Sequence, residues 1–281
     1  MTEPMTLRAR LDAPLKAAYH ALTDPGEMRV WLAEHAEVEL PHRYEFWGRH
    51  TPEGDAPHQR LLHADERSLR FTWLLDGEET TVEIGLEEEG PDSTIITLSQ
   101  THWDFQDALT GAGIRGVLQT YWCLAIANLA DHLAGRELTA KLDFTSPDLR
   151  GEVLIDAARE RVFESLIDSE QASAWFGYPI GIEPWVGGRF AMGGLESGHA
   201  AKILELEPAA KVTIDWGGGA GVSTWELADS GGKTRLTFVQ SGFDASRPPY
   251  AAWAGTVSGI AELRRYHEIP DWRPIWIHDA A

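Results

Sequence analysis

One stretch of this sequence occurs twice, and that repeat limits the fold more than any other feature. Residues 11–32, LDAPLKAAYHALTDPGEMRVWL, correspond at a constant offset of 144 to residues 155–176, IDAARERVFESLIDSEQASAWF. The positions that agree best are Asp12 and Asp156, Ala13 and Ala157, Leu22 and Leu166, Asp24 and Asp168, and Trp31 and Trp175. A single offset of this size indicates two whole domains rather than an array of short repeats.

The repeat continues to the end of each half. Residues 94–104, TIITLSQTHWD, correspond to residues 234–244, TRLTFVQSGFD, at an offset of 140, as loop deletions between the copies would produce. A chain of 281 residues suits two domains of ordinary size. We predict a first domain over 1–136, a linker over 137–148, a second domain over 149–268, and a tail over 269–281 that packs on the body because it is rich in tryptophan.

Both halves show the same order of predicted elements. A strand (7–12; 151–156) is followed by two short helices, the second ending at Leu32 or Phe176, and then by residues that alternate between polar and apolar as in an antiparallel meander. A long amphipathic helix closes each half, over 113–133 and about 250–265. The predicted fold class is α+β, with two tandem domains, each a curved seven-stranded antiparallel sheet with two short helices and a long C-terminal helix.

Charge and motif content exclude several function classes. The net charge is −20, which repels phosphate backbones and anionic lipids, so we expect neither a nucleic-acid nor a membrane partner. The sequence has no H-E-x-x-H or C-x-x-C motif, so no metal or other cofactor is predicted. A single cysteine, Cys123, and the lack of an apolar leader in the first residues predict a cytoplasmic protein. The oligomeric state is left open.

This order of elements resembles the helix-grip fold of START, Bet v 1 and polyketide-cyclase domains. Residues 11–32 resemble the opening signature of the homologues of the heat-shock chaperone ATPase activator, residues 187–190 (GGRF) resemble their Gly-Gly-x-Phe strand, and residues 204–216 (LELEPAAKVTIDW) resemble their strand-Pro-strand-Trp hairpin. The first half departs from the pattern, with HRYEFW at 42–47 where Gly-Gly-x-Phe should stand.

The resemblance implies a function as well as a fold. Members of this superfamily mostly bind hydrophobic ligands between the long helix and the sheet, and some catalyse the cyclisation or dehydration of polyketides. Tandem proteins of similar length occur among aromatase/cyclases and in enediyne gene clusters. The resemblance therefore implies binding of a hydrophobic, polyketide- or polyene-like small molecule in natural-product biosynthesis or self-resistance.

Large aromatic residues are the candidates for lining such a cavity. A long helix laid across a curved sheet leaves an apolar space beneath its middle, and tryptophan offers both a large apolar surface and one N–H donor. The alternative is that the same rings simply fill the core. The candidate ligand-binding residues are Trp31, Trp47, Trp73, Trp103, Trp122, Ile126, Trp175, Phe176, Trp216, Trp225, Phe243 and Trp253.

The sequence leaves the choice between a binding protein and an enzyme open. The alternative function is a polyketide aromatase/cyclase, in which His20, His63 or Tyr121 would transfer protons to a substrate held in a reactive bend. A His102-Trp103-Asp104 run is a weaker candidate, because strand alternation places His102 and Asp104 opposite Trp103. A third hypothesis is a chaperone-regulating interaction module, which the acidic composition does not favour.

Overall fold

The computed structural model describes residues 4–102, 113–198, 200–217 and 219–277. The chain divides into two compact units. The first is formed by the described residues up to Ser146, together with Tyr250–Ser258 and the segment that begins at Ile275. The second is formed by Pro147–Pro249 and Gly259–Pro274.

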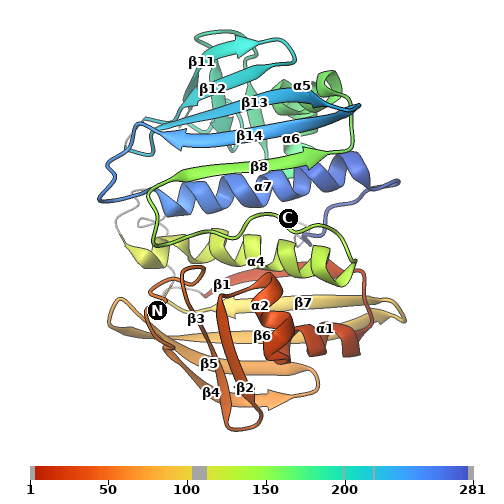
Figure 1. Ribbon diagram of the computed structural model, residues 1–281, viewed down its shortest axis with the longest axis vertical. Helices are drawn as coiled ribbons and strands as arrows, with labels where there is room; N and C mark the ends of the chain where they lie inside the picture. Colours follow the sequence, from red (N-terminus) through yellow and green to blue (C-terminus); the bar gives the residue numbers. More distant parts are fainter. Residues whose placement is uncertain (1–3, 103–112, 199, 218, 278–281) are drawn as a thin grey trace. The chain divides into compact units, whose positions relative to one another are not determined.

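The first unit has the predicted order of elements. Its strands and helices are β1 (Met5–Leu11), α1 (Leu15–Thr23), α2 (Pro25–Trp31), β2 (His35–Glu39), β3 (Arg43–Trp47), β4 (Gln59–Asp65), β5 (Ser68–Leu75), β6 (Glu78–Gly90), β7 (Ser93–Gln100), a 3₁₀ turn η1 (Ile114–Val117) and α4 (Leu118–Leu133). The long helix α4 lies along β1 (Figure 1).

In the first unit the seven predicted strands are divided between two sheets. Five strands form a sheet in the order β1-β7-β6-β5-β4, whereas β2 and β3 pair only with each other. Between β3 and β4 the backbone N–H of Phe46 donates to the side-chain oxygen of Gln59 (3.2 Å).

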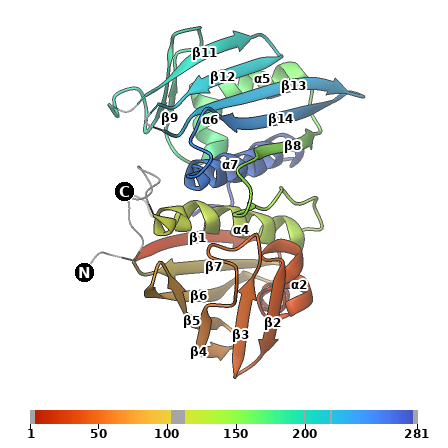
Figure 2. The same cartoon turned by 60° about the vertical axis from the view of Figure 1, so that its left-hand side comes forward.

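The second unit confirms the predicted sheet. Its elements are β8 (Leu149–Ile155), α5 (Arg159–Ile167), α6 (Ser169–Phe176), β9 (Ile180–Ile182), β10 (Arg189–Met192), β11 (Ala201–Glu207), β12 (Lys211–Asp215), β13 (Val222–Ser230), β14 (Lys233–Ser241) and the part of α7 (Tyr250–Glu268) that begins at Gly259. All seven strands form one antiparallel sheet in the order β8-β14-β13-β12-β11-β10-β9, with α5 packed against β13 and β14 (Figures 1 and 2).

The repeat seen in the sequence extends to individual hydrogen bonds. The indole N–H of Trp31 donates to the backbone oxygen of Ala21 (2.9 Å), and that of Trp175 donates in the same way to Ser165 (2.8 Å). A second bond is repeated between a threonine hydroxyl and the end of the first strand, in the pairs Thr94 with Ala13 and Thr234 with Ala157. In both copies the tryptophan bond therefore joins the two short helices, and the threonine bond joins the segment before them to the sheet.

The segment after α7 is held by the body of the protein. The N–H of Arg10 donates to Ile275 (2.7 Å) and the N–H of Ile277 donates to Arg8 (2.9 Å), so that residues 275–277 lie antiparallel to β1. Before them, Trp272 packs edge-on against Tyr266, with 5.1 Å between ring centroids. None of the helices in the described part of the chain is long and apolar enough to cross a membrane.

Candidate functional site

The space between α4 and the sheet of the first unit is filled by aromatic rings. Neighbouring rings lie 5.1 to 6.5 Å apart between centroids, most of them edge to face, which is the favoured geometry for aromatic pairs. None of these side chains is more than 4% exposed. The rings belong to Tyr44, Phe46, Phe71, Trp73, Tyr121 and Trp122.

A buried glutamine fixes this aromatic cluster to the sheet. The indole N–H of Trp122 on α4 donates to the side-chain oxygen of Gln100 (2.7 Å), and the amide of Gln100 donates to the hydroxyl of Thr80 (2.9 Å). That hydroxyl donates in turn to the backbone oxygen of Trp73 (2.9 Å). The helix is thus held at a set distance from the sheet by a chain of fully buried hydrogen bonds.

Residues 136–146, here called the strap, cover the side of the first unit next to α4. The backbone of Thr139 exchanges two hydrogen bonds of 3.0 Å with the side chain of Asn128 on α4. The ammonium of Lys141 donates to the backbone oxygens of Arg29 (2.9 Å) and Val30 (3.0 Å), at the C-terminal end of α2, where a cation is favoured. The strap is therefore part of the first unit and not a free linker.

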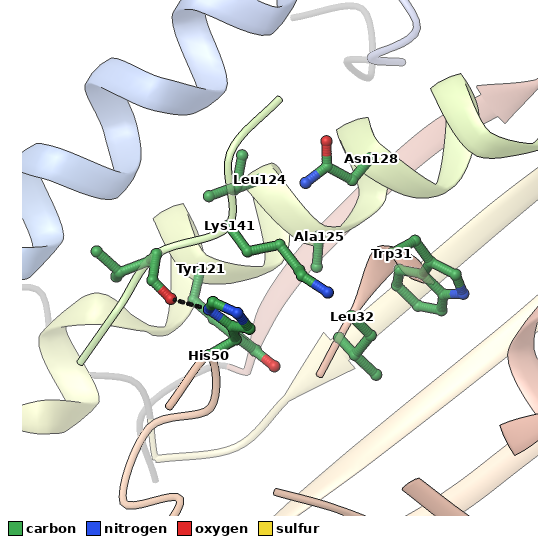
Figure 3. A pocket seen from close by; sticks show the side chains of 9 residues that line it. Trp31, Leu32, His50, Tyr121, Leu124, Ala125, Asn128 and Lys141 are labelled. Atoms are coloured by element: carbon green, nitrogen blue, oxygen red, sulfur yellow. Dashed lines mark hydrogen bonds between the residues drawn. The ribbon is translucent and has the colours of Figure 1, made fainter. Parts of the chain in front are cut away.

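Beneath the strap lies a cavity of about 10 Å³. The ring N–H of His50 donates to the backbone oxygen of Leu142 across it (2.8 Å), and burial lowers the pKa of both His50 and Lys141 (Figure 3). A volume of this size holds at most one water molecule. Its lining consists of Trp31, Leu32, His50, Tyr121, Leu124, Ala125, Asn128, Lys141 and Leu142. In the first unit the aromatic cluster and the strap therefore occupy the space beneath the long helix, where the sequence-based hypothesis places a cavity.

The inner face of the second sheet carries a different set of rings, which includes the fully buried Phe238 on β14. Phe190 packs edge-on against Trp216 and Trp225, with 5.6 and 6.2 Å between centroids. In the repeat, the positions of Tyr44, Phe71 and Tyr121 are taken by Gly188, Ile214 and the exposed Ala252. Three rings of the first copy are thus replaced by smaller residues in the second, whereas Leu98 is replaced by the larger Phe238 at the offset of 140.

Trp225 and Trp216 differ in how their indole N–H groups are satisfied. The N–H of Trp216, which is half-buried, donates to the hydroxyl of Ser223 (2.7 Å), and Ser223 in turn bonds to Gln240. The N–H of Trp225 is buried and has no hydrogen-bond partner in the described part of the chain. A buried donor without an acceptor costs about 1–3 kcal/mol, so it marks a place where an acceptor would bind favourably.

One end of the second sheet is rich in glycine, and we call it the glycine-rich end. Because the strands are antiparallel, the loops that follow β10, β12 and β14 leave the sheet at the same end. The glycines there with positive φ are Gly193, Gly194, Gly198, Gly217, Gly219, Gly221 and Gly242. At Gly221 an added Cβ would lie 2.1 Å from the backbone oxygen of Ser241, so only glycine fits.

The remaining predicted ligand-binding residues are spread over both units. Trp47 is half-buried and its ring lies 5.4 Å from that of His35. Phe176, next to Gly177 at the end of α6, and Phe243, after β14, are half-buried near the glycine-rich end. Trp103 lies outside the described residues, whereas Ile126, Trp175 and Trp253 are buried.

Sequence reasoning missed the polar residues that organise both interiors. Gln100 and Gln240 occupy the same position of the repeat, in TIITLSQ and TRLTFVQ. A buried glutamine at the end of an otherwise apolar strand face was a signal available in the sequence. The contacts of Asn128 and Lys141 had no comparable signal, because their partners are backbone atoms far away in the sequence.

The candidate proton-transfer residues are not gathered at one site. His20 is exposed on α1, and His63 is exposed and bonded to Asp65 (2.9 Å). Tyr121 is buried in the aromatic cluster, where burial raises the pKa of its hydroxyl. His102 is exposed and lies 3.5 Å from Glu78, while Trp103 and Asp104 fall outside the described residues.

Comparison with protein families gives a match over most of the chain. The model of the family described as "Activator of Hsp90 ATPase homolog 1-like protein" matches residues 12–134 and residues 156–267. Curated proteins give no match to the sequence.

Several solved structures are similar in fold. CalU16 from Micromonospora echinospora is 24% identical, with 48% of this chain and 76% of that chain covered and a TM-score of 0.38. DynU16, a putative protein in the dynemicin biosynthetic locus, is 15% identical over 95% of this chain and 98% of its own, with a TM-score of 0.39. The di-domain ARO/CYC BexL from the BE-7585A biosynthetic pathway is 13% identical over 96% and 100%, with a TM-score of 0.36.

Proposed function

Because the chain belongs to the family of Activator of Hsp90 ATPase homolog 1-like proteins in both of its halves, we propose that it binds a hydrophobic small molecule in its second unit. The ligand is polyketide- or polyene-like, and it lies on the inner face of the second sheet, among Phe190, Trp216 and Trp225. The first unit, with its filled interior, serves as a rigid partner domain.

The observation that carries this proposal is the buried, unpaired indole N–H of Trp225. It lies on a sheet face where Gly188 and Ile214 replace ring-bearing residues of the first unit. A ligand oxygen that accepts this hydrogen bond removes the desolvation penalty of the donor. The site therefore favours an apolar molecule that carries at least one carbonyl or hydroxyl oxygen.

The chemistry of the walls supports the ligand class. Edge-on rings of Phe190, Trp216 and Trp225 contact flat or extended unsaturated molecules well, since aromatic pairs prefer offset and edge-to-face contacts. Access is from the glycine-rich end, where positive-φ glycines allow the loops to adopt conformations that other residues disfavour. The assignment to natural-product biosynthesis or self-resistance rests on the sequence resemblance to tandem helix-grip proteins of such gene clusters.

A fluorescence titration tests the proposal. A panel of aromatic polyketides and polyenes is titrated into the protein while tryptophan emission is recorded, and saturable quenching at micromolar concentrations is expected for at least one of them. Trp225→Phe keeps a ring but removes the N–H, so it should weaken that ligand by roughly five- to tenfold, the value of one neutral hydrogen bond.

Trp73→Phe is the matched control. Trp73 also has a buried indole N–H without a partner in the described part of the chain, but it lies in the filled first unit. This variant should leave the affinity unchanged. Equal loss in both variants, or no quenching by any member of the panel, would overturn the proposal.

A further inference from the structure

A second hollow, of about 330 Å³, lies in the second unit at the C-terminal end of α7. None of the aromatic residues assigned above to the hydrophobic ligand lines it. Side chains from α5, α6, α7 and the segment after α7 contribute to it, and most of them are polar. The lining residues are Arg161, Glu164, Gln171, Tyr266, His267, Ile269, Asp271 and Trp272.

Two of these side chains have polar atoms without partners. Both ring nitrogens of His267 and the indole N–H of Trp272 are buried and make no hydrogen bond in the described part of the chain. Three such atoms at one hollow are unusual, because the great majority of buried polar groups in native proteins are paired. Both rings are held edge-on against Tyr266, with centroids 5.2 and 5.1 Å away.

The first unit contains a histidine near the end of its long helix that does have a partner. His132 on α4 is hydrogen-bonded to the carboxylate of Glu27 on α2. The position equivalent to Glu27 is Gln171, which lines the hollow and whose side-chain oxygen accepts from Ser165 (2.8 Å). The offset of 131 between the long helices aligns His132 with Leu263, so His267 is an addition of the second unit, and no carboxylate lies at the position of Glu27.

A second replacement makes the same place more polar. Arg161 takes the position of Ala17 at the offset of 144. Burial, with a smaller contribution from the positive charge of Arg161, lowers the pKa of His267 to about 4. The imidazole is therefore neutral near pH 7, with one N–H donor and one lone pair to satisfy.

The charges and donors at the hollow select the ligand. Arg161 contributes one positive charge and Glu164 and Asp271 contribute two negative ones, so the net charge disfavours anions. A hydroxyl group both donates and accepts, as the neutral imidazole requires, and it also accepts from the N–H of Trp272. We propose that this hollow binds a small, neutral, polyhydroxylated molecule of the size of a sugar ring.

The size of the hollow agrees with this ligand. A volume of about 330 Å³ is at the lower end of the range for small-molecule sites. The ring nitrogens of His267 and the indole N–H of Trp272 are all shielded in the unliganded protein, so the proposed binding requires both rings to turn toward the hollow. This site is independent of the hydrophobic ligand site, so either can exist without the other.

Nuclear magnetic resonance on the full chain tests the inference. D-glucose and methyl glucoside are the probes, and the signals followed are the ring protons of His267 and the indole N–H of Trp272. Both signals should shift and saturate together, with a dissociation constant on the order of 1 mM. Gln171→Glu places a carboxylate at the hollow, so it should raise the pKa of His267 and weaken sugar binding roughly tenfold.

Three further measurements make the outcome decisive. Trp272→Phe removes the indole N–H, so it should weaken sugar binding without raising the pKa of His267. Glu27→Gln in the first unit should leave sugar binding unchanged. Glycine and inorganic phosphate should produce no saturable shift. The inference is wrong if no sugar shifts these signals, if phosphate or glycine binds in its place, or if Gln171→Glu raises the pKa while sugar affinity stays the same. Polyketide quenching is tested by Trp225→Phe and sugar binding by Trp272→Phe and Gln171→Glu, so failure here is distinct from failure of the proposed function.

Discussion

Gln100 and Gln240 show how one position of a repeat acquires two roles. Gln100 accepts from Trp122 on the long helix and donates to Thr80 on the sheet. Gln240 instead accepts from Ser223 and donates to the backbone of Ala220, in the loop at the glycine-rich end. The same side chain thus locks the helix in the first unit and orders the loop beside the ligand site in the second.

Replacement of Gln100 should destabilise the first unit. Gln100→Ala leaves the indole N–H of Trp122 without an acceptor and removes the amide that donates to Thr80, so we expect a loss of about 1–3 kcal/mol in the free energy of unfolding. Urea unfolding followed by tryptophan emission measures it. The exposed Gln119→Ala is the control, and an equal effect of both variants would contradict the assigned role.

His267 should make the second unit sensitive to acid. Its pKa is about 6.5 when unfolded and about 4 when folded, so the unfolded state takes up the proton first as the pH falls. The contribution to stability is fully present above pH 6.5 and is lost as the pH falls toward 4. His267→Gln should flatten this part of the stability profile measured by urea unfolding, whereas the exposed His20→Gln should not.

At the scale of elements, the strap is the main departure from the sequence-based interpretation. The sequence predicts a linker over 137–148, with its only strong turn signal at Ser146-Pro147-Asp148. In the structure Thr139, Lys141 and Leu142 are held by Asn128, by the end of α2 and by His50. Such contacts join side chains to backbone atoms on distant elements, and no local pattern encodes them. The separation of β2 and β3 from the main sheet likewise has no local signal in the sequence.

The strap should loosen when its anchor on α4 is removed. Asn128→Ala deletes both hydrogen bonds to the backbone of Thr139, and we expect amide exchange over residues 137–144 to accelerate by roughly tenfold or more, as a loss of about 1–3 kcal/mol implies. Mass-spectrometric hydrogen exchange reports this change. Amides of α5 and α6 serve as the internal control and should exchange as before; unchanged exchange in the strap would contradict its anchoring.

At the scale of the whole molecule, two copies of one fold have diverged in their interiors. The constant offset of 144 predicted the duplicated architecture, because the residues that form strands and short helices are kept in both copies. It did not predict which copy is filled, since a tryptophan in a sheet packs equally well on a ligand or on another ring. The interiors differ by Tyr44, Phe71 and Tyr121 in one copy against Gly188, Ile214 and Ala252 in the other, and in the opposite sense by Leu98 against Phe238.

The most direct test of the central claim follows two indole signals during one titration. The quenching polyketide or polyene is added to ¹⁵N-labelled protein, and the N–H resonances of Trp225 and Trp73 are assigned by the Trp225→Phe and Trp73→Phe variants. The account predicts a saturable downfield shift of the Trp225 signal, as its unpaired donor gains an acceptor, with the Trp73 signal unmoved. A shift of Trp73 alone, or saturable ligand binding that leaves Trp225 unmoved, would show that the ligand does not bind on the second sheet.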